Sequence, residues 1–179
     1  MENNLIRRIK GGDVGALDIL VNEYYEMIYR FCYCKLNGDT FTAADITQDV
    51  FASLIENIKE YRFFGKFKNY IFTIAINKCK NYYKKSKTLP VDIASFEIRS
   101  DIPDLLEKIE KEEMSLRIKR ILGKLPDYQK DVIILRFYHE MKVKDIAAVT
   151  GVSLPTAKSR LRQGMEKIRT MMEDEDFEI

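Results

Sequence analysis

The 179-residue chain contains no tryptophan, a single histidine and three cysteines. An odd number of cysteines gives no disulfide framework and is typical of a reducing compartment. No apolar run is long enough to span a membrane. The segment from Met1 to Lys10 has two adjacent arginines and lacks the apolar core of a secretion signal. These absences argue against a secreted disulfide scaffold and against membrane insertion, and they favour a cytoplasmic protein.

Residues that could carry chemistry are also scarce. Cys32 and Cys34 lie two apart on an expected helix, where they point to different faces, and no further Cys or His cluster accompanies them. We therefore interpret them as core thiols and not as metal ligands. His139 lies in the connecting segment from Phe137 to Lys142 with no evident nucleophile or orienting partner, so we expect a solvated loop residue. With no phosphate-binding loop either, the sequence predicts no cofactor, no metal and no enzymatic activity.

The net charge of +2 conceals a strong segregation of charge along the chain. Residues 59–87 hold nine Lys or Arg against one acid, and residues 114–172 hold thirteen against five. Between them, residues 88–113 hold three against eight, and residues 173–179 hold five acids and no base. Two basic blocks around an acidic spacer suggest two surfaces that face nucleic acid, although such blocks are also common on solvated surfaces.

The acidic spacer is also a candidate domain boundary. Ser86 to Pro103 contains two prolines and no sustained helical period, while long helical patterns flank it and strand signals are nearly absent elsewhere. We therefore predict an all-α fold of two small helical bundles joined by a flexible acidic linker. The expected bounds are residues 1–86, 87–112 and 113–179, the last including an acidic tail that we expect to be disordered from Glu173 onward.

A helix-turn-helix is predicted in the second bundle. Lys142 to Val149 has the pattern of a short amphipathic helix, and Gly151 can adopt the left-handed conformation that ends it. Ser153 can cap the next helix, with Pro155 in its first turn. Beyond Leu154, apolar residues at helical spacing predict a buried stripe made of Ala157, Leu161, Met165, Ile168 and Met172.

The opposite face of this second helix is polar and basic. In a helix-turn-helix the second helix enters the major groove of DNA, so this face is a candidate for base and phosphate contacts. A helical hairpin with a solvated basic face is the alternative. The candidate DNA-binding residues are Thr156, Lys158, Ser159, Arg160, Arg162 and Gln163.

Two faces are likewise predicted for the helix from Ala43 to Ile58. Its buried stripe consists of Ile46, Val50, Phe51, Leu54, Ile55 and Ile58. Its outer face, at spacings of three and four, consists of Asp45, Gln48, Asp49, Ala52 and Glu56. An acidic and amide surface without cations suits docking on a basic protein surface, and a solvated helix face fits the periodicity equally well.

The stretch from Glu60 to Lys85 interleaves aromatic and cationic residues, and Gly65 interrupts it. We expect the following helix to bury Tyr70, Ile71, Ile74 and Ala75. Its expected outer face consists of Thr73, Asn77, Lys80, Asn81 and Lys84. Aromatic rings stack on splayed bases, cations hold phosphates, and Asn or Thr recognises base edges. This combination suits single-stranded or melting DNA, although we expect most of the aromatic residues to belong to the core.

These motifs resemble a known family. The run from Ala44 to Phe51 is similar to the core-polymerase-binding motif of sigma factors. The runs Leu125–Val132, Leu135–Phe137 and Thr156–Leu161 are similar to the fourth domain of the same proteins. Their order and the size of the chain resemble the extracytoplasmic-function (ECF) group of the sigma-70 family, which keeps only the second and fourth domains.

The resemblance implies specific roles and partners. Asp45, Gln48, Asp49 and Phe51 match the motif that engages the β′ clamp of core RNA polymerase, Phe51 through the fold more than by contact, and Glu56 lies on the same helix. The fourth domain would contact the β flap. The acidic linker would thread toward the RNA exit path, and an anti-sigma protein would hold the factor inactive. The residues matching the minus-ten segment are Gly65, Lys66, Lys68, Asn69, Thr73, Asn77, Lys80, Asn81 and Lys84. The helix from Leu154 would bind the minus-thirty-five element of promoter DNA.

The chain departs from the family at three positions. Tyr70 stands where a tryptophan is usual, Ile76 where an arginine is usual, and Ala44 where a glutamate is common. The expected function is that of an alternative sigma factor in the bacterial cytoplasm. One alternative is an operator-binding regulator with a ligand-sensing first bundle, which leaves the Ala44–Phe51 motif unexplained. The other is a polymerase-binding antagonist without promoter specificity.

Overall fold

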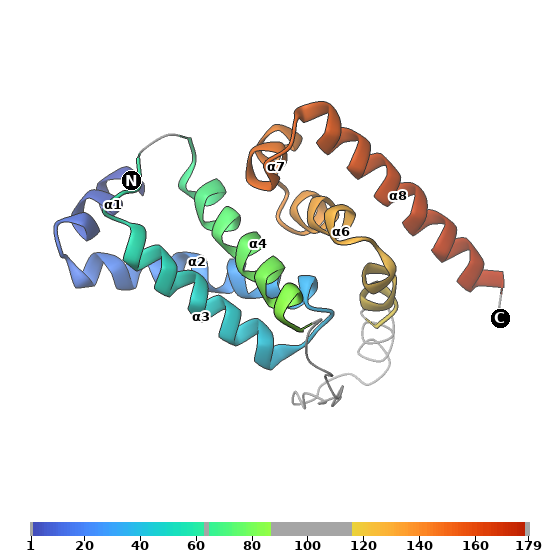
Figure 1. The fold of residues 1–179 in the computed structure, drawn as a ribbon, viewed down its shortest axis with the longest axis horizontal. Coiled ribbons are helices and arrows are strands. Elements are labelled where there is room, and N and C mark those ends of the chain that lie inside the picture. Colours follow the sequence, from blue (N-terminus) through green and yellow to red (C-terminus); the bar gives the residue numbers. More distant parts are fainter. Residues whose placement is uncertain (1, 63–64, 87–115, 178–179) are drawn as a thin grey trace, which may run out of the picture.

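The computed structural model describes residues 2–62, 65–86 and 116–177, and in these ranges every regular element is a helix. The all-α prediction is confirmed. The first bundle contains α1 (Glu2–Lys10), α2 (Val14–Lys35), α3 (Thr40–Asn57) and α4 (Phe67–Ser86). The second contains a helical stretch at 116–124, α6 (Asp127–Ile133), the π-helix η1 (Ile134–Tyr138), α7 (Val143–Thr150) and α8 (Leu154–Phe177). The expected linker at 87–112 lies outside the described residues. Figure 1 shows the two bundles side by side.

Local capping determines where α2 and α3 begin. Asp13 accepts a hydrogen bond from the backbone N–H of Ala16 at 3.0 Å, and Asp39 accepts one from that of Thr42 at 3.0 Å. Each carboxylate satisfies an N–H group that has no partner within its own helix. Helices α2, α3 and α4 pack against one another around a buried apolar core. The outer faces of α3 and α4 are thereby held in fixed positions.

The predicted stripe of α3 is confirmed except at one residue. Ile46, Val50, Phe51, Leu54 and Ile58 are buried, whereas Ile55 is 44% exposed. Its position one residue after Leu54 places Ile55 at the edge of the stripe, beyond the area that α2 and α4 cover. The prediction that Ile55 belongs to the core was therefore wrong.

The turn between α7 and α8 forms as the sequence predicts. Gly151 ends α7 with φ of +68°, and the N–H of Val152 donates to the carbonyl of Ala147 at 3.0 Å. Ser153 Oγ accepts a hydrogen bond from the N–H of Thr156 at 3.3 Å. These interactions fix the direction in which α8 leaves the turn.

The buried line of α8 differs from the predicted stripe. Met165 and Met172 are 41% and 38% exposed, whereas Gly164 is buried. A Cβ atom on Gly164 would lie 3.1 Å from Cγ1 of Ile133, so α8 crosses α6 with its backbone unusually close at this residue. Contact with α6 is therefore centred on Gly164 and not on Met165, a shift that apolar periodicity does not show.

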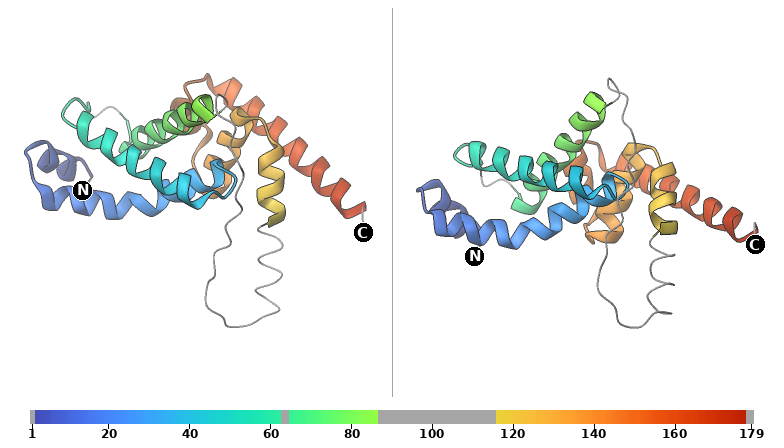
Figure 2. Two further views of the ribbon diagram at one scale, coloured as in Figure 1. Left: turned by 60° about the horizontal axis from the view of Figure 1, so that its bottom comes forward. Right: turned by 90° about the horizontal axis from the view of Figure 1, so that it is seen from below.

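The acidic tail is helical where the structure describes it. Helix α8 continues to Phe177, so the expectation of disorder from Glu173 was wrong for this part. No glycine or proline interrupts the sequence after Gly164, and Arg169 pairs with Glu173 at 3.7 Å one turn later. Figure 2 shows the end of α8 extending beyond the rest of the molecule.

The two bundles pack directly against each other. Helix α4 contacts α7, α2 contacts η1, and buried residues from both bundles form one continuous cluster. The sequence predicted a connection through the linker but not this contact. The candidate surfaces of the two bundles therefore have a defined relative position in the free chain.

The cysteines and the apolar helices show no sign of further sites within the described residues. Cys32 and Cys79 are buried with their Sγ atoms 4.0 Å apart, and Cys34 is half-buried. No group of three or more potential metal ligands occurs in this part of the chain. No helix that the structure describes is long and apolar enough to cross a membrane.

Replacing Gly151 by alanine should destabilise the protein by about 1 kcal/mol, because a side chain is strained at φ of +68°. Urea unfolding followed by circular dichroism would measure the change. Gly15→Ala is the matched control, since Gly15 lies in the first turn of α2 without a positive φ. Equal stability of the Gly151→Ala variant and the wild type would contradict this account of the turn.

Candidate nucleic-acid and polymerase interfaces

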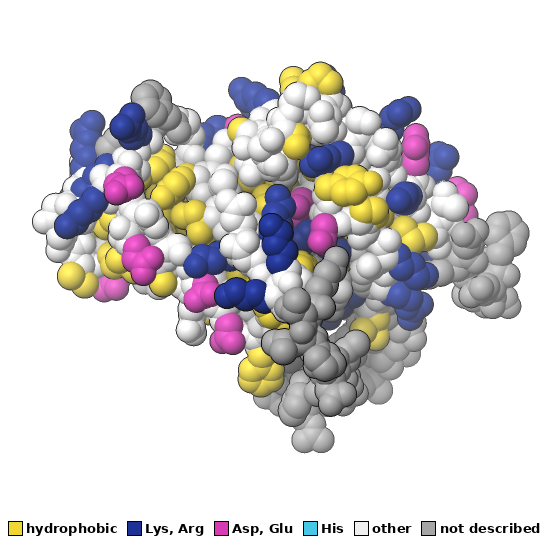
Figure 3. All heavy atoms as spheres, viewed as in Figure 1, with side chains coloured by type: hydrophobic (Ala, Val, Ile, Leu, Met, Phe, Trp, Pro, Cys, Tyr) yellow, Lys and Arg dark blue, Asp and Glu magenta, His cyan; other side chains and the backbone are white. Residues whose placement is uncertain are grey.

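The acidic face of α3 is exposed as the sequence predicts. Asp45, Gln48, Asp49, Ala52 and Glu56 all lie on the surface, and α3 contains no Lys or Arg. We call these five residues the α3 strip. Figure 3 shows acidic side chains along α3 on this face of the molecule.

Phe51 differs from the residues of the strip. It is 6% exposed, and its ring stacks on that of Tyr25 with the centroids 5.9 Å apart. Because Phe51 is covered by its own bundle, it can support the strip only by holding α3 in place.

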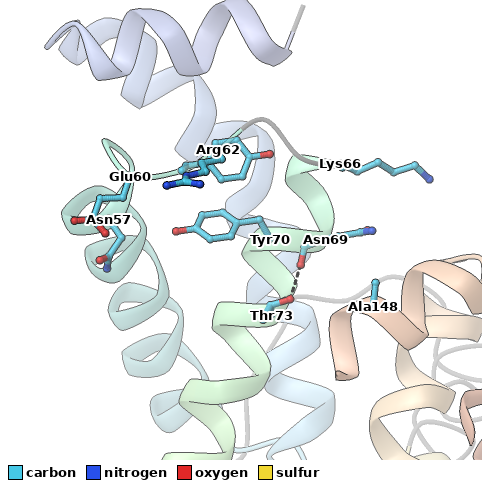
Figure 4. Close-up of a pocket in the computed structure, with 10 residues that line it drawn as sticks. Asn57, Glu60, Arg62, Lys66, Asn69, Tyr70, Thr73 and Ala148 are labelled. Atoms are coloured by element: carbon cyan, nitrogen blue, oxygen red, sulfur yellow. Dashed lines mark hydrogen bonds between the residues drawn. The ribbon is translucent and has the colours of Figure 1, made fainter. Parts of the chain in front are cut away.

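The residues around Gly65 form one side of a cleft of about 530 Å³. Gly65 has φ of +81°, and α4 begins two residues later. The lining residues are Asn57, Glu60, Tyr61, Arg62, Gly65, Lys66, Asn69, Tyr70, Thr73 and, from the second bundle, Ala148. In Figure 4, Tyr70 points toward Asn57, Glu60 and Arg62, whereas Lys66 and Asn69 point to the other side of α4.

Aromatic rings form the floor of this cleft. The rings of Tyr61 and Tyr70 lie 4.7 Å apart, and both contact Phe67 at 5.6 and 6.1 Å. Tyr61 and Phe67 are buried, whereas Tyr70 is half-buried and presents part of its ring to the cleft. Burial raises the pKa of the Tyr70 hydroxyl, which is therefore a neutral hydrogen-bonding group at neutral pH. A flat aromatic surface beside polar and cationic groups is suited to holding an unstacked base.

The structure separates the predicted minus-ten residues into three groups. Gly65, Lys66, Asn69 and Thr73 line the cleft, and Thr73 Oγ1 donates to the Asn69 carbonyl at 2.9 Å. Lys68 lies elsewhere, since its Nζ donates to the carbonyl of His139 at 3.3 Å. The exposed group further along α4 consists of Asn77, Lys80, Asn81 and Lys84.

The sequence analysis predicted neither the burial of Ile76 nor all of the residues that line the cleft. Ile76 is 1% exposed, so it packs in the core and does not belong to the exposed face of α4. Sequence analysis missed Asn57, Glu60, Tyr61 and Arg62 as cleft residues. Their position before Gly65 could have indicated this, because a turn at Gly65 brings the preceding segment close to α4.

The basic face of α8 is largely free to meet a ligand. Thr156, Lys158, Ser159, Arg162 and Gln163 are exposed. Arg162 lies 4.0 Å from Glu166 in a pair that is open to solvent.

Arg160 is the exception among the candidates on α8. It is half-buried, with its guanidinium 5.1 Å from the ring centre of Tyr128. Gln163 is also connected to α6, because Gln129 Nε2 donates to its Oε1 at 3.3 Å. Both residues therefore anchor α8 to α6 as well as facing outward.

Charged groups from both bundles meet where α4 faces α7. Lys66 Nζ lies 2.8 Å from Oδ2 of Asp145, and Asn69 Nδ2 donates to Oδ1 of the same carboxylate at 3.2 Å. The hydrogen bond from Lys66 lowers the pKa of Asp145, which stays ionised. One carboxylate of the second bundle thus holds two candidate DNA-binding residues of the first.

A deeper set of ionic contacts joins α2 to α6. The ammonium of Lys35 is fully buried and lies 2.9 Å from Asp131 Oδ1 and 3.1 Å from Asp127 Oδ1. Lys130 Nζ donates to Asn37 Oδ1 at 2.6 Å and to the carbonyl of Lys35 at 3.3 Å. We call Lys35, Asp127, Lys130 and Asp131 the ionic cluster. It is the charged centre of the contact between the bundles.

His139 is buried and not solvated, which corrects the sequence prediction. It is 8% exposed, and its ring lies 4.8 Å from that of Phe72 and 6.0 Å from that of Phe31. The π-helix η1 brings it there, because the His139 N–H bonds to the carbonyl of Ile134 five residues earlier. Burial, together with the nearby Lys68 and Arg30 cations, lowers the pKa of His139 to about 4.

Comparison with known proteins decides between the possible families. Residues 20–88 match the family described as Sigma-70 region 2, and residues 115–168 match Sigma-70, region 4. The chain belongs to the ECF group of the sigma-70 family. It is thus a sigma factor, which binds core RNA polymerase and directs promoter-specific initiation of transcription.

Two relatives of this sigma factor match it along nearly its whole length. It is 28% identical to "ECF RNA polymerase sigma factor SigW" of Bacillus subtilis, covering 94% of this chain and 95% of the relative. It is 23% identical to "ECF RNA polymerase sigma-E factor" of Haemophilus influenzae, covering 94% of both chains.

Two solved structures share its fold. CnrH, in complex with the cytosolic domain of CnrY, superposes with a TM-score of 0.73 at 19% identity, over 95% of this chain and 96% of that one. The sigma factor RpoE of Bartonella quintana, in complex with the anti-sigma factor NepR, gives 0.70 at 19% identity, over 87% and 96%.

Acidification should destabilise this sigma factor through His139. The folded state holds His139 neutral down to a pKa of about 4, whereas the unfolded chain takes up a proton near pH 6.5. The stability of the folded state that depends on a neutral His139 is therefore fully present above pH 6.5 and is lost as the pH falls toward 4. Between pH 7 and pH 5 the free energy of unfolding should fall by about 2 kcal/mol.

Urea unfolding at the two pH values, with His139→Phe as the control, would measure this effect. Phenylalanine fills a similar space and takes up no proton, so most of the pH dependence should disappear in the variant. The nearby Glu23, Glu26, Arg30, Lys68 and Glu140 remain in both proteins. An identical pH dependence in wild type and variant would show that His139 is not the responsible group.

Proposed function

We propose that this sigma factor acts through three surfaces, each carried by a different helix. The α3 strip binds core polymerase, the cleft and outer face of α4 bind the minus-ten element, and the polar face of α8 binds the minus-thirty-five element. The corresponding domains are residues 1–86 and 113–179, joined by residues 87–112. Binding energy alone performs this task, so we infer that the protein has no catalytic activity of its own and works in the bacterial cytoplasm.

The exposure of the complete α3 strip is the observation that carries the proposal. Five polar or small residues at spacings of three and four are all on the surface, on a helix with no cation of its own. The β′ clamp of polymerase is the expected partner, with Asp45, Gln48, Asp49 and Glu56 making the polar contacts. Phe51 acts through the packing of α3, as its burial indicates.

The cleft at Gly65 provides chemistry for opened DNA. Tyr70 can stack on a base, Asn69 can recognise a base edge, and Lys66 can hold a phosphate. Beyond the cleft, Asn77, Lys80, Asn81 and Lys84 continue the polar surface along α4. Capture of a flipped base offsets the few kcal/mol of unstacking that opening requires.

On α8, the exposed Thr156, Lys158, Ser159 and Arg162 provide hydroxyl and cationic groups at the start of the helix. This is the part of a helix-turn-helix that contacts base edges in the major groove. Arg160 and Gln163 complete the surface. The same bundle is the expected partner of the β flap.

Control by an anti-sigma factor is a further part of the proposal. RpoE of Bartonella quintana, which shares the fold of this chain over both bundles, was solved in complex with the anti-sigma factor NepR. CnrH was solved in complex with the cytosolic domain of CnrY. We infer that a protein inhibitor of this kind also holds this sigma factor.

Run-off transcription with purified core polymerase tests the proposal as a whole. Promoter fragments selected from the source genome should give specific starts only when both proteins are present. An operator-binding regulator would bind DNA without polymerase, and an antagonist would bind polymerase without producing starts. Either result would exclude the proposed function and support the corresponding alternative.

Asp49→Lys should weaken binding to core polymerase by at least about tenfold, because a cation would face a basic partner surface. Co-purification and a titration of labelled sigma factor with core polymerase would measure it. Asp18→Lys makes the same charge change on the exposed surface of α2 and should bind normally. Normal binding by Asp49→Lys would exclude the α3 strip as the docking surface.

Arg162→Ala should weaken recognition of the upstream element by roughly 1–3 kcal/mol if the guanidinium contacts a base. Holoenzyme binding to promoter fragments with intact and scrambled upstream elements would separate specific from general binding. Arg169→Ala, which removes the same charge two turns further along α8, should have a smaller effect. An unchanged promoter footprint for Arg162→Ala would count against this helix face.

A further inference from the structure

The last residue of α1 contacts the segment that follows α3. Lys10 Nζ donates hydrogen bonds to the backbone carbonyl of Lys59 at 3.1 Å and to that of Tyr61. Helix α1 itself packs on α2, with Ile6 and Ile9 buried. Figure 1 shows α1 near the C-terminal end of α3. The Lys10 ammonium therefore connects the N-terminal helix to a part of the chain that is distant in sequence.

Residues 58–62, which we call the cleft segment, form part of the cleft at Gly65. The ring of Tyr61 is buried at the floor, 4.7 Å from the ring of Tyr70. Glu60 and Arg62 line the cleft on either side of Tyr61 in the sequence, and Tyr70 points toward both (Figure 4). The position of the cleft segment therefore sets the space that is open beside the Tyr70 ring.

The backbone of the cleft segment is held from two sides. On one side, the N–H groups of Glu60 and Tyr61 donate to carbonyl groups three residues earlier, at 3.1 and 3.2 Å. Bonds of this kind form a short, tight turn with poorer geometry than an α-helix. On the other side, Lys10 bonds to the carbonyls of Lys59 and Tyr61, which lie beyond the end of α3. The turn and the ammonium together fix where the Tyr61 ring lies.

An ammonium group is well suited to hold this turn. It carries three donors and no acceptor, and a charged donor gives a stronger hydrogen bond than a neutral one. The bond from Lys10 to the Tyr61 carbonyl is partly buried, so water competes with it less than with an exposed contact. The two bonds also occupy two of the three donors. Lys10 is thus engaged within the protein and is less available to a phosphate than an exposed cation.

We propose that Lys10 is a positioning residue for the minus-ten cleft. From α1 it holds the cleft segment against α4, so that Tyr61 supports the Tyr70 ring at the spacing that accepts an unstacked base. Lys10 acts through the backbone of the cleft segment and does not contact DNA. The inference rests on the proposed role of the cleft in binding opened promoter DNA, and it extends that role to the N-terminal helix.

Lys10→Met should weaken binding of the holoenzyme to single-stranded minus-ten DNA by about tenfold. Methionine keeps an apolar stem but has no donor, and a tenfold loss is expected if the cleft segment then adopts the binding position about a tenth of the time. The probe is a fluorescein-labelled oligonucleotide with the minus-ten element of a promoter mapped by run-off transcription. Fluorescence anisotropy would measure its affinity. Binding of the variant to core polymerase should be unchanged.

Two variants separate positioning from a direct contact with DNA. Arg7→Met removes a cation from the exposed surface of the same helix and should change the affinity by less than about twofold. Lys10→Arg keeps a charged donor and should bind within about twofold of the wild type. The salt dependence of binding should have the same slope in Lys10→Met and the wild type, whereas loss of a phosphate contact lowers that slope by about one.

A double-mutant cycle with Tyr70→Ala tests whether Lys10 acts through the cleft. If it does, Lys10→Met should weaken binding by less than about twofold once the Tyr70 ring is absent, since both changes then remove the same binding element. Circular dichroism would confirm that each variant is folded. Lys10→Gln, which keeps one neutral donor, would take the place of Lys10→Met if the latter does not fold.

Four results would overturn the positioning role. They are normal binding by Lys10→Met, equal losses for Lys10→Met and Arg7→Met, no rescue by Lys10→Arg, and losses for Lys10→Met and Tyr70→Ala that simply add. Tyr70→Ala also separates this inference from the proposed function. If Tyr70→Ala weakens binding and Lys10→Met does not, only the role of Lys10 fails. If Tyr70→Ala binds the probe as the wild type does, the proposed role of the cleft fails instead.

Discussion

The buried ammonium of Lys35 is the interaction on which the arrangement of the two bundles depends. It ends α2 with its charge completely removed from water, and the carboxylates that neutralise it belong to α6. Alternative positions of the second bundle would leave this charge buried without a partner or return it to solvent. The ion pairs thus select one geometry without making it strongly favourable.

Features controlled by local sequence could be predicted. The α3 strip, the break at Gly65 and the helix-turn-helix each follow from helical periodicity or from a residue with a special backbone preference. The exposed face of α8 was also predicted correctly, because polar residues at helical spacing remain on the surface whatever α8 packs against. Such features depend on neighbours in the chain, and a single sequence contains those neighbours.

Features that depend on a partner far away in the sequence could not be predicted. Ile55 and Met165 are apolar at positions consistent with burial, but they are 44% and 41% exposed. His139 is enclosed by Phe31 and Phe72 from the other bundle, and nothing near it in the sequence indicates these rings. Asp145 lies in the first turn of α7, and no neighbouring residue in the sequence indicates its partner. Its significance comes from Lys66, seventy-nine residues earlier, and only the packing of α7 on α4 brings them together.

The exposure of Lys66 gives the molecule a response to ionic strength. Its contact with Asp145 is a single pair in which the lysine is 58% exposed, so added salt weakens it only modestly. DNA is held by many cations at once and releases a counterion for each phosphate neutralised, so its affinity falls steeply with salt. As the salt concentration rises, the balance between the intramolecular contact and DNA shifts toward the intramolecular contact. At high ionic strength the contact between Lys66 and Asp145 therefore persists where contacts between the protein and DNA are weakened.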